Sequence, residues 1–465
     1  MSHLFKPVTL SLAALLLSGC ATSALPPATF ATPAAFSGPS VAVTAPHAMV
    51  QGAAWWLVFS DPVLNDLMAR AMDKNNDVKL AAAHLEQARG LVRSSHADLW
   101  PQAGIGFAAG RSTDLQPAGK AANHGALDLD LSYEVDLAGR LSKASKAASL
   151  DADSGQAVLR DSQLLIQSRV AQTYFALRAL DEDRAIVSDT LAAYRGTLEV
   201  TTRRFQEGDV AELDVARLQT EVAATQAEGL ALDQQRAQLA HALAVLLGEP
   251  AGGFDMTAQS WAQQPWASAV PAIPAGIPSE MLERRPDVIA AQASMEAAQQ
   301  RLGIAKVAWF PSLGLTASGG YASGDLGDLF RDAAKNWSLT ALLSQAVFDG
   351  GRRRADVDYA HGGLDAAFAT YQQNVLVAFA DVEDQLSDLS YLAQQQVSED
   401  QAVAAAGKAM AMSQSRYSNG SASQLEVLDA QRQLLSIRRQ ALRVRAAQYQ
   451  STVGLIRALG GSWQG

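Results

Sequence analysis

The sequence predicts a mainly α-helical protein that also forms a membrane β-barrel and is built from two internal repeats. Three observations lead to this fold class. The chain repeats itself with a period near 210 residues, and each half contains two segments in which apolar and polar residues alternate. The rest of each half consists of long Ala- and Gln-rich stretches that are typical of helices.

The N-terminus has the features of an export signal followed by a lipid attachment site. Lys6 precedes the apolar run 8–17, which is too short to span a bilayer. The residues Leu-Ser-Gly-Cys at 17–20 look like a lipobox, at which bacterial lipoproteins are cleaved before a cysteine that is then acylated. Cys20 is the only cysteine of the chain, so we expect a signal peptide over 1–19 and a lipid on Cys20 rather than a chance cysteine.

The residues after Cys20 indicate the destination of the chain. An Asp directly after the cysteine would resemble the signal for inner-membrane retention, and Ala21 stands there instead, so we expect sorting to the outer membrane. Residues 20–50 are rich in Ala, Pro, Ser and Thr and predict a flexible tether after the lipidated N-terminus. The net charge of -10, without a long basic block, argues against a nucleic-acid partner.

The two repeats are expected at 51–248 and 287–461, separated by a proline-rich linker, or equatorial region, over 249–286. Several short motifs recur in the same order and at the same spacing in both halves. They are Trp100-Pro101 with Phe310-Pro311, Arg204-Phe205-Gln206-Glu207-Gly208 with Arg416-Tyr417-Ser418-Asn419-Gly420, and Leu247-Gly248 with Leu459-Gly460.

Each repeat contributes two expected barrel strands, at about 102–112 and 127–137 in the first and about 312–322 and 337–348 in the second. The clearest alternation is in 127–137, where apolar residues at odd positions alternate with mainly acidic and polar residues at even positions. A tilted strand of about 11 residues can cross a hydrophobic band of ~25 Å with one face on lipid and one on water. A half-buried soluble sheet alternates too, but the carboxylates favour a water-filled lumen.

Four strands cannot close a barrel, so copies of the chain must associate until no free edge faces lipid. Two copies give eight strands, whose interior is normally filled by side chains, whereas three give twelve and leave room for solvent. A conduit therefore predicts a homotrimer in which each protomer supplies four strands.

The expected helices have complementary lengths. Pro101 and Pro311 end helices of about 25 residues, and Gly139 and Gly350 begin stretches of roughly 65 residues, or ~95 Å. The stretches after Gly208 and Gly420 have about 39 residues, or ~60 Å. Two shorter helices stacked end to end can flank one long helix, which predicts a long α-helical barrel.

Three motifs make the chain resemble the TolC-like outer-membrane efflux family, in its lipoprotein branch related to OprM and NodT. They are Trp-Trp-Leu-Val-Phe-Ser-Asp-Pro-Val-Leu at 55–64, Ile-Pro-Ser-Glu-Met-Leu-Glu-Arg-Arg-Pro-Asp at 277–287, and Leu-Asp-Ala-Gln-Arg at 428–432. We interpret Arg284-Arg285-Pro286-Asp287 as a structural helix start without transport chemistry.

The resemblance implies a trimeric twelve-stranded outer-membrane barrel above a long periplasmic α-helical barrel. It also implies a passive exit duct for small molecules in a tripartite multidrug efflux system. A periplasmic membrane-fusion adaptor and an inner-membrane transporter of the RND type would be the partners, with outer-membrane lipid around the barrel. Type I protein secretion stays open as an alternative. The resemblance does not name the cargo or the cognate partners.

The repeated turns are expected to be the periplasmic tips at which the adaptor docks. Glycine tolerates the left-handed backbone that such a turn often requires. An ordinary helix-hairpin turn would explain the glycines but not the duplicated Arg-aromatic frame. The docking residues are Arg204, Phe205, Gly208, Arg416, Tyr417 and Gly420.

The periplasmic gate is expected at Leu425 and Asp429, four residues apart on one helix, with Tyr417 added by the family resemblance. Three copies would form an apolar ring beside an acidic ring, which concentrates cations. Whether the acidic ring binds a divalent ion stays open. The alternative for Asp429 is a local pair with Arg432, worth a few tenths of a kcal/mol.

Two other classes of protein compete with a duct. An enzyme is disfavoured because the seven histidines are scattered and no metal-ligand, nucleophile-elbow or phosphate-loop motif occurs. We therefore expect neither catalysis nor a metal, and no cofactor beyond the lipid on Cys20. A lipid-anchored coiled-coil scaffold would explain the long helices but not the four alternating segments.

Overall fold

The computed structural model describes Phe36 and residues 54–113, 121–264, 269–274, 282–324 and 326–461. The expected signal peptide, Cys20 and the tether lie outside the described residues. The chain divides into two compact units, which we describe separately. The sheet unit comprises the described residues of Glu86–Ser154 and Ala291–Gln372, and the helical unit comprises those of Thr32–Leu85, Gly155–Ala290 and Gln373–Gly465.

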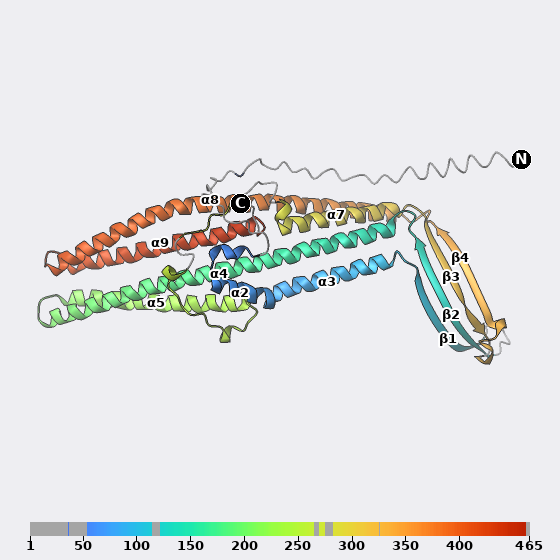
Figure 1. Cartoon of the computed structure of the whole chain (residues 1–465), viewed down its shortest axis with the longest axis horizontal. Helices are drawn as coiled ribbons and strands as arrows, with labels where there is room; N and C mark the ends of the chain where they lie inside the picture. The colour runs from blue at the N-terminus through green and yellow to red at the C-terminus, as the bar shows by residue number, and fades with distance from the viewer. Residues whose placement is uncertain are drawn as a thin grey trace. The chain divides into compact units, whose positions relative to one another are not determined.

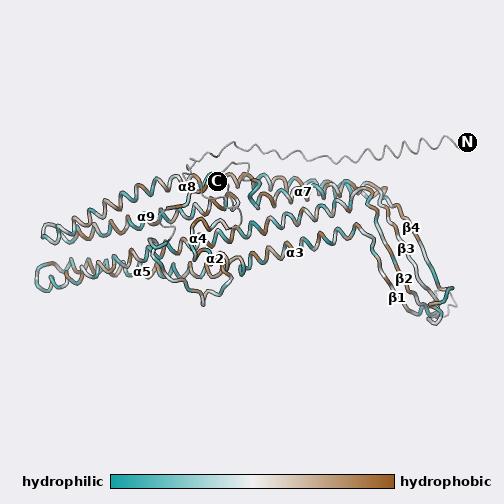
Figure 2. The backbone as a smooth tube through the Cα atoms, viewed as in Figure 1, coloured by the Kyte–Doolittle hydropathy of each residue, from teal (hydrophilic) through white to brown (hydrophobic). Residues whose placement is uncertain are grey.

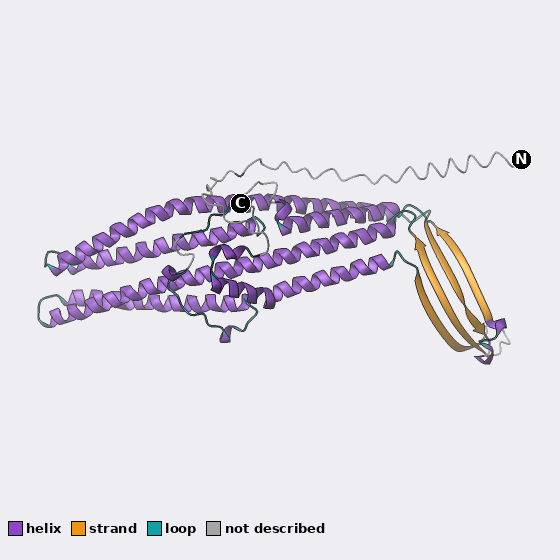
Figure 3. Ribbon diagram, viewed as in Figure 1, coloured by secondary structure: helices purple, strands orange, loops and turns teal. Residues whose placement is uncertain are grey.

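The sheet unit contains one four-stranded antiparallel sheet with the strand order β1-β2-β3-β4 (Figure 1, Figure 3). The strands are β1 (Gln102–Thr113), β2 (Ala121–Val135), β3 (Ser312–Ser323) and β4 (Lys335–Ser344). Short 3-10 turns, η4 (Leu326–Asp328) and η5 (Asp332–Ala334), lie between β3 and β4. The central pair β2–β3 joins the two halves of the sequence, and β1 and β4 are the edges.

Two strands differ from the expected boundaries. β4 ends at Ser344 and not at 348, because its last partner is Ser312 and the preceding Pro311 has no N–H to continue the ladder. β2 starts earlier than expected, opposite Thr113, and stops at Val135 instead of 137. It stops there because the Asp136 carboxylate accepts hydrogen bonds from the first backbone N–H groups of the next helix, at 3.0 and 2.8 Å.

The helices occur in pairs of equal length. These are α3 (Asn76–Ala97) and α7 (Pro286–Val307) with 22 residues, α4 (Arg140–Gln206) and α8 (Arg352–Ser418) with 67, and α5 (Glu212–Leu246) and α9 (Gln424–Ala458) with 35. The remaining described helices are η1 (Trp55–Phe59), α2 (Pro62–Lys74), η2 (Ala251–Gly253) and η3 (Trp261–Gln263). Among the described residues, none of the helices carries an apolar stretch of the length that a membrane crossing requires.

Within the helical unit, α4 with α5 and α8 with α9 form two antiparallel hairpins. Arg195 of α4 donates to Gln226 of α5 at 3.2 Å, and Arg184 reaches Asp233 further from the turn at 2.6 Å. In the second hairpin, Gln448 of α9 donates to the backbone oxygen of Leu392 in α8 at 3.1 Å.

An aromatic core holds the segment before α2 against these helices. The Phe59 ring lies 4.8 Å from that of Phe175 on α4, which in turn lies 5.3 Å from Tyr449 on α9. Trp55 is fully buried and donates to Gln167 at 3.0 Å. Asp61 caps α2 through the backbone N–H groups of residues 63 and 64 and also accepts from the Tyr174 hydroxyl. The apolar residues of this opening segment therefore serve the core.

The two halves use the same joint where a 35-residue helix ends beside the start of a 22-residue helix. In the first half, the Asn75 amide donates to the Leu246 backbone oxygen at 2.9 Å. In the second half, Arg285 donates to the Ala458 backbone oxygen at 3.3 Å. Gly460 has a positive φ of 83°, and a Cβ there would lie 2.8 Å from the Arg284 backbone oxygen. Close backbone approach therefore requires glycine at this joint.

Arg285 is the centre of the second joint and is only 6% exposed. It binds Asp287 through two hydrogen bonds of 3.0 and 2.6 Å and Asp381 of α8 through one of 2.9 Å. Burial opposes ionisation of Asp287, but the bonds and charge of Arg285 outweigh it and hold the Asp287 pKa below its ordinary value. The Arg-Pro-Asp motif thus ties the start of α7 to α8 and α9.

Candidate functional site

The four strands place large apolar side chains together on one face of the sheet. Directly paired residues of antiparallel strands share a face, and the row Ile105, Leu129, Gly319 and Trp337 crosses all four strands. Several of these side chains are strongly exposed: Ile105 is 78%, Leu339 75% and Trp337 82% exposed. The apolar face consists of Ala103, Ile105, Phe107, Leu127, Leu129, Leu131, Tyr133, Val135, Leu313, Leu315, Ala317, Tyr321, Trp337, Leu339, Ala341 and Leu343.

The opposite face is polar and carries carboxylates. Asp128 lies between Gly106 and Gly320, and the next row contains Asp130 with Ser318. Figure 2 shows hydrophobic and hydrophilic residues following one another along the labelled strands. The polar face consists of Gln102, Gly104, Gly106, Asp128, Asp130, Ser132, Glu134, Gly314, Thr316, Ser318, Gly320, Asn336, Ser338 and Thr340, interrupted by Leu342.

This arrangement specifies two different surroundings for one sheet. A contiguous band of exposed large apolar side chains is unfavourable in water and marks a surface that meets lipid or another protein. The polar face, in contrast, must lie against water, because carboxylates placed in an apolar environment without partners are strongly unfavourable. Alternating faces of this kind are the arrangement of a strand between lipid and an aqueous lumen.

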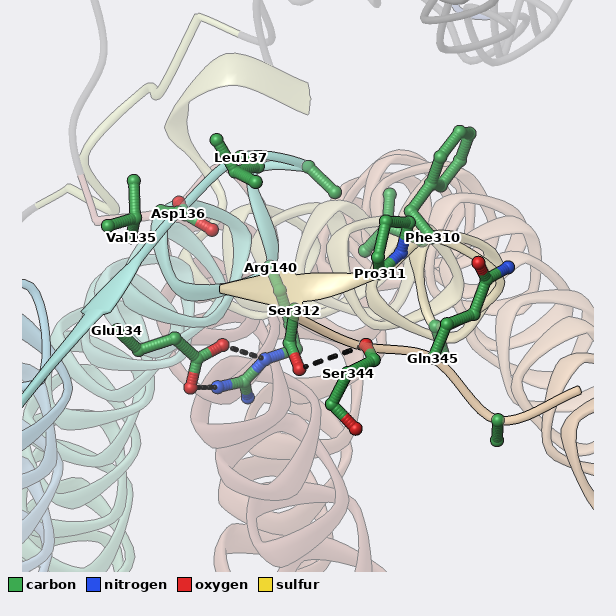
Figure 4. A pocket seen from close by; sticks show the side chains of 14 residues that line it. Glu134, Val135, Asp136, Leu137, Arg140, Phe310, Pro311, Ser312, Ser344 and Gln345 are labelled. Carbon is green, nitrogen blue, oxygen red and sulfur yellow. Dashed lines mark hydrogen bonds and ion pairs between the residues drawn. The ribbon is translucent and has the colours of Figure 1, made fainter. Parts of the chain in front are cut away.

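A cavity of about 340 Å³ lies where the strands meet the adjoining helix ends of the sheet unit (Figure 4). Arg140 makes a bidentate ion pair with Glu134, with hydrogen bonds of 3.2 and 2.8 Å, and its positive charge balances the negative charge of that carboxylate. In Figure 4, Leu137 and Phe310 lie on the side opposite Arg140, so this cavity is lined by both apolar and charged side chains.

The turns at Gly208 and Gly420 have the same geometry. Both glycines have positive φ, of 86° and 75°. The N–H of residue 209 reaches the Arg204 backbone oxygen at 2.9 Å, and the N–H of residue 421 reaches that of Arg416 at 2.8 Å. These bonds, with those from the glycines to residues 205 and 417, form a Schellman motif. The glycines are explained by local geometry alone.

The Arg-aromatic residues of the two turns join the hairpins within one chain. Arg204 donates to the Tyr417 hydroxyl at 3.1 Å, and its guanidinium lies 5.9 Å from the Tyr417 ring centre. Gln424 at the start of α9 donates to Thr201 of α4 at 2.8 Å. Phe205 is 40% exposed, and Arg416 pairs instead with Glu426 at 3.1 Å. The duplicated frame thus forms one contact between the halves and leaves Phe205 accessible.

Of the expected gate residues, Leu425 and Asp429 lie on α9 and Tyr417 lies on α8. Leu425 is 41% exposed and the Asp429 side chain 63% exposed. Asp429 lies 3.7 Å from Arg432, so the expected alternative pair is present. Arg432, however, makes its close contact with Glu221 of α5. Tyr417 contacts Arg204 of the other hairpin.

Glu221 and a buried cluster near it were not anticipated. Tyr194, Leu218 and Leu428 pack together from α4, α5 and α9. Seven residues along the helices from the Arg432–Glu221 pair, Arg439 binds Glu228 and also Asp183. Both Arg–Glu pairs join residues that lie 211 positions apart, one in each half of the chain, and no local pattern in the sequence singles them out.

No grouping of His, Cys, Asp and Glu that could hold a metal occurs in the part of the chain that the structure describes. His361 lies beside Asp365 at 3.0 Å on an exposed part of α8. The main features that the described side chains form are the separate apolar and polar surfaces of the sheet and the ionic contacts between the hairpins.

Comparison with known proteins gave consistent matches. A family model described as "Outer membrane efflux protein" matches residues 67–249 and 277–461. The solvent efflux pump outer membrane protein SrpC of Pseudomonas putida is 34% identical over 412 residues, covering 87% of this chain and 86% of that protein. The pyoverdine export outer membrane protein OpmQ of Pseudomonas aeruginosa is 32% identical, covering 88% and 87%.

Solved structures agree over nearly the whole length. The outer-membrane channel OprN superposes with a TM-score of 0.84 at 28% identity, covering 94% of this chain and 99% of that chain. The open state of the MtrE outer membrane channel of Neisseria gonorrhoeae superposes with a TM-score of 0.83 at 26% identity, covering 93% and 96%.

Proposed function

The chain belongs to the outer membrane efflux protein family, and we propose that it is the exit duct of a tripartite efflux system that passively conducts small molecules. The observation that carries this proposal is the sheet with one mainly apolar face, on which several large side chains are exposed, and one polar face. Relatives are named for the export of solvents and of pyoverdine, so the proposed cargo class is small organic molecules.

The duct is proposed to be a homotrimer with a twelve-stranded barrel. The free edges β1 and β4 support this, because each presents unpaired backbone groups that lipid cannot satisfy. Three copies close the sheet and leave room for a water-filled interior along the polar faces. The equal helix lengths of the two halves support an origin by duplication, with repeats at 51–248 and 287–461.

The remaining proposals concern the ends of the chain. The turns at Gly208 and Gly420 would receive a periplasmic adaptor, which connects to an inner-membrane transporter. Leu425 and Asp429, with Tyr417, would form the closed gate in three copies. Cys20 lies outside the described residues and would carry the lipid, which the intact mass of the mature chain can test.

Neighbouring lysine substitutions test the two faces of the sheet. Leu339→Lys places a charge on the apolar face, where lipid contact makes it unfavourable by about 2–4 kcal/mol, whereas Ser338→Lys places the same charge in the lumen. We expect Leu339→Lys to reduce the folded protein recovered from outer membranes and Ser338→Lys to leave that amount unchanged. Purified Ser338→Lys protein should conduct in planar bilayers with a weaker preference for cations than the parent. Equal recovery of the two variants would exclude this orientation of the sheet.

A further inference from the structure

A buried tyrosine beside the ion pair that joins the two hairpins lacks a hydrogen-bond partner. Tyr194 of α4 is only 1% exposed, and among the described residues its hydroxyl has no partner. Nearly all buried hydroxyl groups in native proteins are hydrogen-bonded, because an unsatisfied one keeps the cost of leaving water. The Tyr194 hydroxyl is therefore available to a new acceptor if the surrounding helices move.

The tyrosine ring lies directly below the ion pair. It packs against Leu218 of α5 and Leu428 of α9. Glu221 follows Leu218 by three residues and Arg432 follows Leu428 by four, so both charged side chains rise from the helix faces that the ring contacts. Burial raises the pKa of Tyr194 to about 12, and the negative charge of Glu221 contributes to this increase.

The two partners of the ion pair differ in their access to water. The Glu221 side chain is 15% exposed, whereas that of Arg432 is 48% exposed. If the hairpins separate, the half-exposed Arg432 guanidinium is solvated and the Glu221 carboxylate loses its close donor. The Tyr194 hydroxyl is the uncommitted donor next to it.

Building on the proposed gated duct, we propose that Glu221 exchanges partners when the hairpins move apart. In the state described here it binds Arg432, and in the open state it accepts a hydrogen bond from the Tyr194 hydroxyl. The exchange keeps the buried carboxylate satisfied in both states, so neither state is strongly disfavoured. Tyr194 is then a positioning residue for gating, and its hydroxyl favours the open state only.

Tyr194→Phe removes the hydroxyl and retains the ring. In planar bilayers the full-length variant should have an open probability about three- to tenfold below that of the parent, because only the open state loses a hydrogen bond. Arg432→Gln should raise the open probability, and adding Tyr194→Phe should cancel much of that rise. Tyr449→Phe, which removes another buried tyrosine hydroxyl of the helical unit, is the control and should match the parent.

Distances between spin labels at Asp209→Cys and Ser421→Cys report hairpin separation without any need for current. Arg432→Gln should add a longer-distance population, and the double variant with Tyr194→Phe should lose it. If Tyr194→Phe has no more effect than Tyr449→Phe on either readout, the exchange is wrong. If the distances respond as expected but the protein passes no current, the exchange stands and the duct function fails.

Discussion

A single buried arginine, Arg285, explains the most distinctive motif of the sequence without transport chemistry. Its guanidinium satisfies Asp287, Asp381 and the last turn of α9 at once. Nearby, Asp161 of α4 experiences the opposite balance: burial and the charge of Asp287 raise its pKa, and Arg457 and Arg285 offset this only in part. The pKa values of two aspartates in one neighbourhood are thus shifted in opposite directions.

Substituting these aspartates should have opposite effects on stability. Asp287→Asn leaves Arg285 buried with one carboxylate fewer and should lower the free energy of unfolding at pH 7 by about 3 kcal/mol. Asp161→Asn removes a carboxylate that the fold disfavours in its charged form and should raise the melting temperature at pH 7. The control is Asp66→Asn, which breaks an exposed pair with Arg70 and should change little.

The pH dependence follows from the same shifts. The folded-state pKa of Asp287 is lowered, so its contribution is present above the unfolded-state pKa of about 3.9 and is lost as the pH falls through the folded-state value. The folded-state pKa of Asp161 is raised, so its penalty is present at neutral pH and disappears as the pH falls. Thermal unfolding in detergent between pH 7 and 3 measures both, and parallel curves for the two variants would contradict these assignments.

At the proposed gate, Leu425 and Asp429 offer an apolar and an acidic ring when three copies are combined. The double variant Asp429→Ala, Leu425→Ala should show a larger single-channel conductance with less sensitivity to divalent cations, because the aperture widens and loses charge. The variant Asp214→Ala, which removes the carboxylate 3.6 Å from Arg217 on α5, is the matched control. Unchanged conductance and unchanged divalent sensitivity in the double variant would locate the gate elsewhere.

The long helices end in four Schellman motifs, and their glycines do not have equal roles. Gly208 and Gly420 lie at turns where a Cβ would meet nothing within 4 Å, so only their positive φ demands glycine. Gly248 and Gly460 have positive φ as well, but each also lies against the backbone of another segment. A Cβ added at Gly248 would lie 2.5 Å from the Lys74 backbone oxygen, and one added at Gly460 would lie 2.8 Å from the Arg284 backbone oxygen. The same capping element therefore serves as a turn in one place and as a close backbone contact in the other.

Alanine substitutions should separate these two roles. Gly460→Ala combines backbone strain with a clash against the Arg284 backbone oxygen and should destabilise the protein by about 3 kcal/mol. Gly420→Ala carries only the strain and should lose about 1 kcal/mol. Thermal unfolding monitored by circular dichroism provides the comparison, and equal losses would show that the close contact has no energetic weight.

The exposed residues beside the turn glycines test adaptor docking. Cysteines at Asp209 and Ser421 should form crosslinks to a periplasmic adaptor in cells, because both follow the turns that the Arg-aromatic frames fix. A cysteine at Asp332, whose side chain is 92% exposed beside β4, is the control and should form none. Crosslinks from Asp332 alone would refute the docking assignment.

For the molecule as a whole, the sheet is incomplete in one chain. Each edge strand, β1 and β4, is paired on one side only, and the apolar face exposes residues such as Trp337 and Phe107. These features are unfavourable for a monomer in either water or lipid, because water disfavours the apolar face and lipid cannot satisfy the edges. The proposed trimeric barrel would remove both features, because lipid would cover the apolar face and neighbouring copies would pair the edges.

Association should accordingly give three copies in detergent. Light scattering or native mass spectrometry of the purified protein should yield three times the 49.1 kDa of the chain, less any signal peptide. Three copies are expected because twelve strands leave a water-filled interior, whereas eight would fill it with side chains. A stable monomer or dimer that still conducts would contradict the barrel proposal.

The sequence by itself determined the kinds of element and their order. Alternation with period two identified four strands, Pro101 and Pro311 marked helix ends, and the repeat gave two equivalent halves. These signals are local or periodic, so each is legible without knowing which segments meet. The family resemblance, carried by motifs at both ends of the chain, agreed with the later family match.

Only the tertiary structure decided the contacts between distant segments. The end of β4 at Ser344 depends on its pairing with Ser312. Arg432 lies near Asp429 on its own helix, but its close contact is with Glu221, which is 211 residues away in the sequence. Likewise, the sequence predicts a helix start at the Arg-Pro-Asp motif. The hydrogen bond from Arg285 to Asp381 depends on the folded chain, which brings α8 beside the motif. The local sequence determines which partners a side chain can reach on its own helix, three or four residues away. Which carboxylates of other helices come within reach depends on how the helices pack.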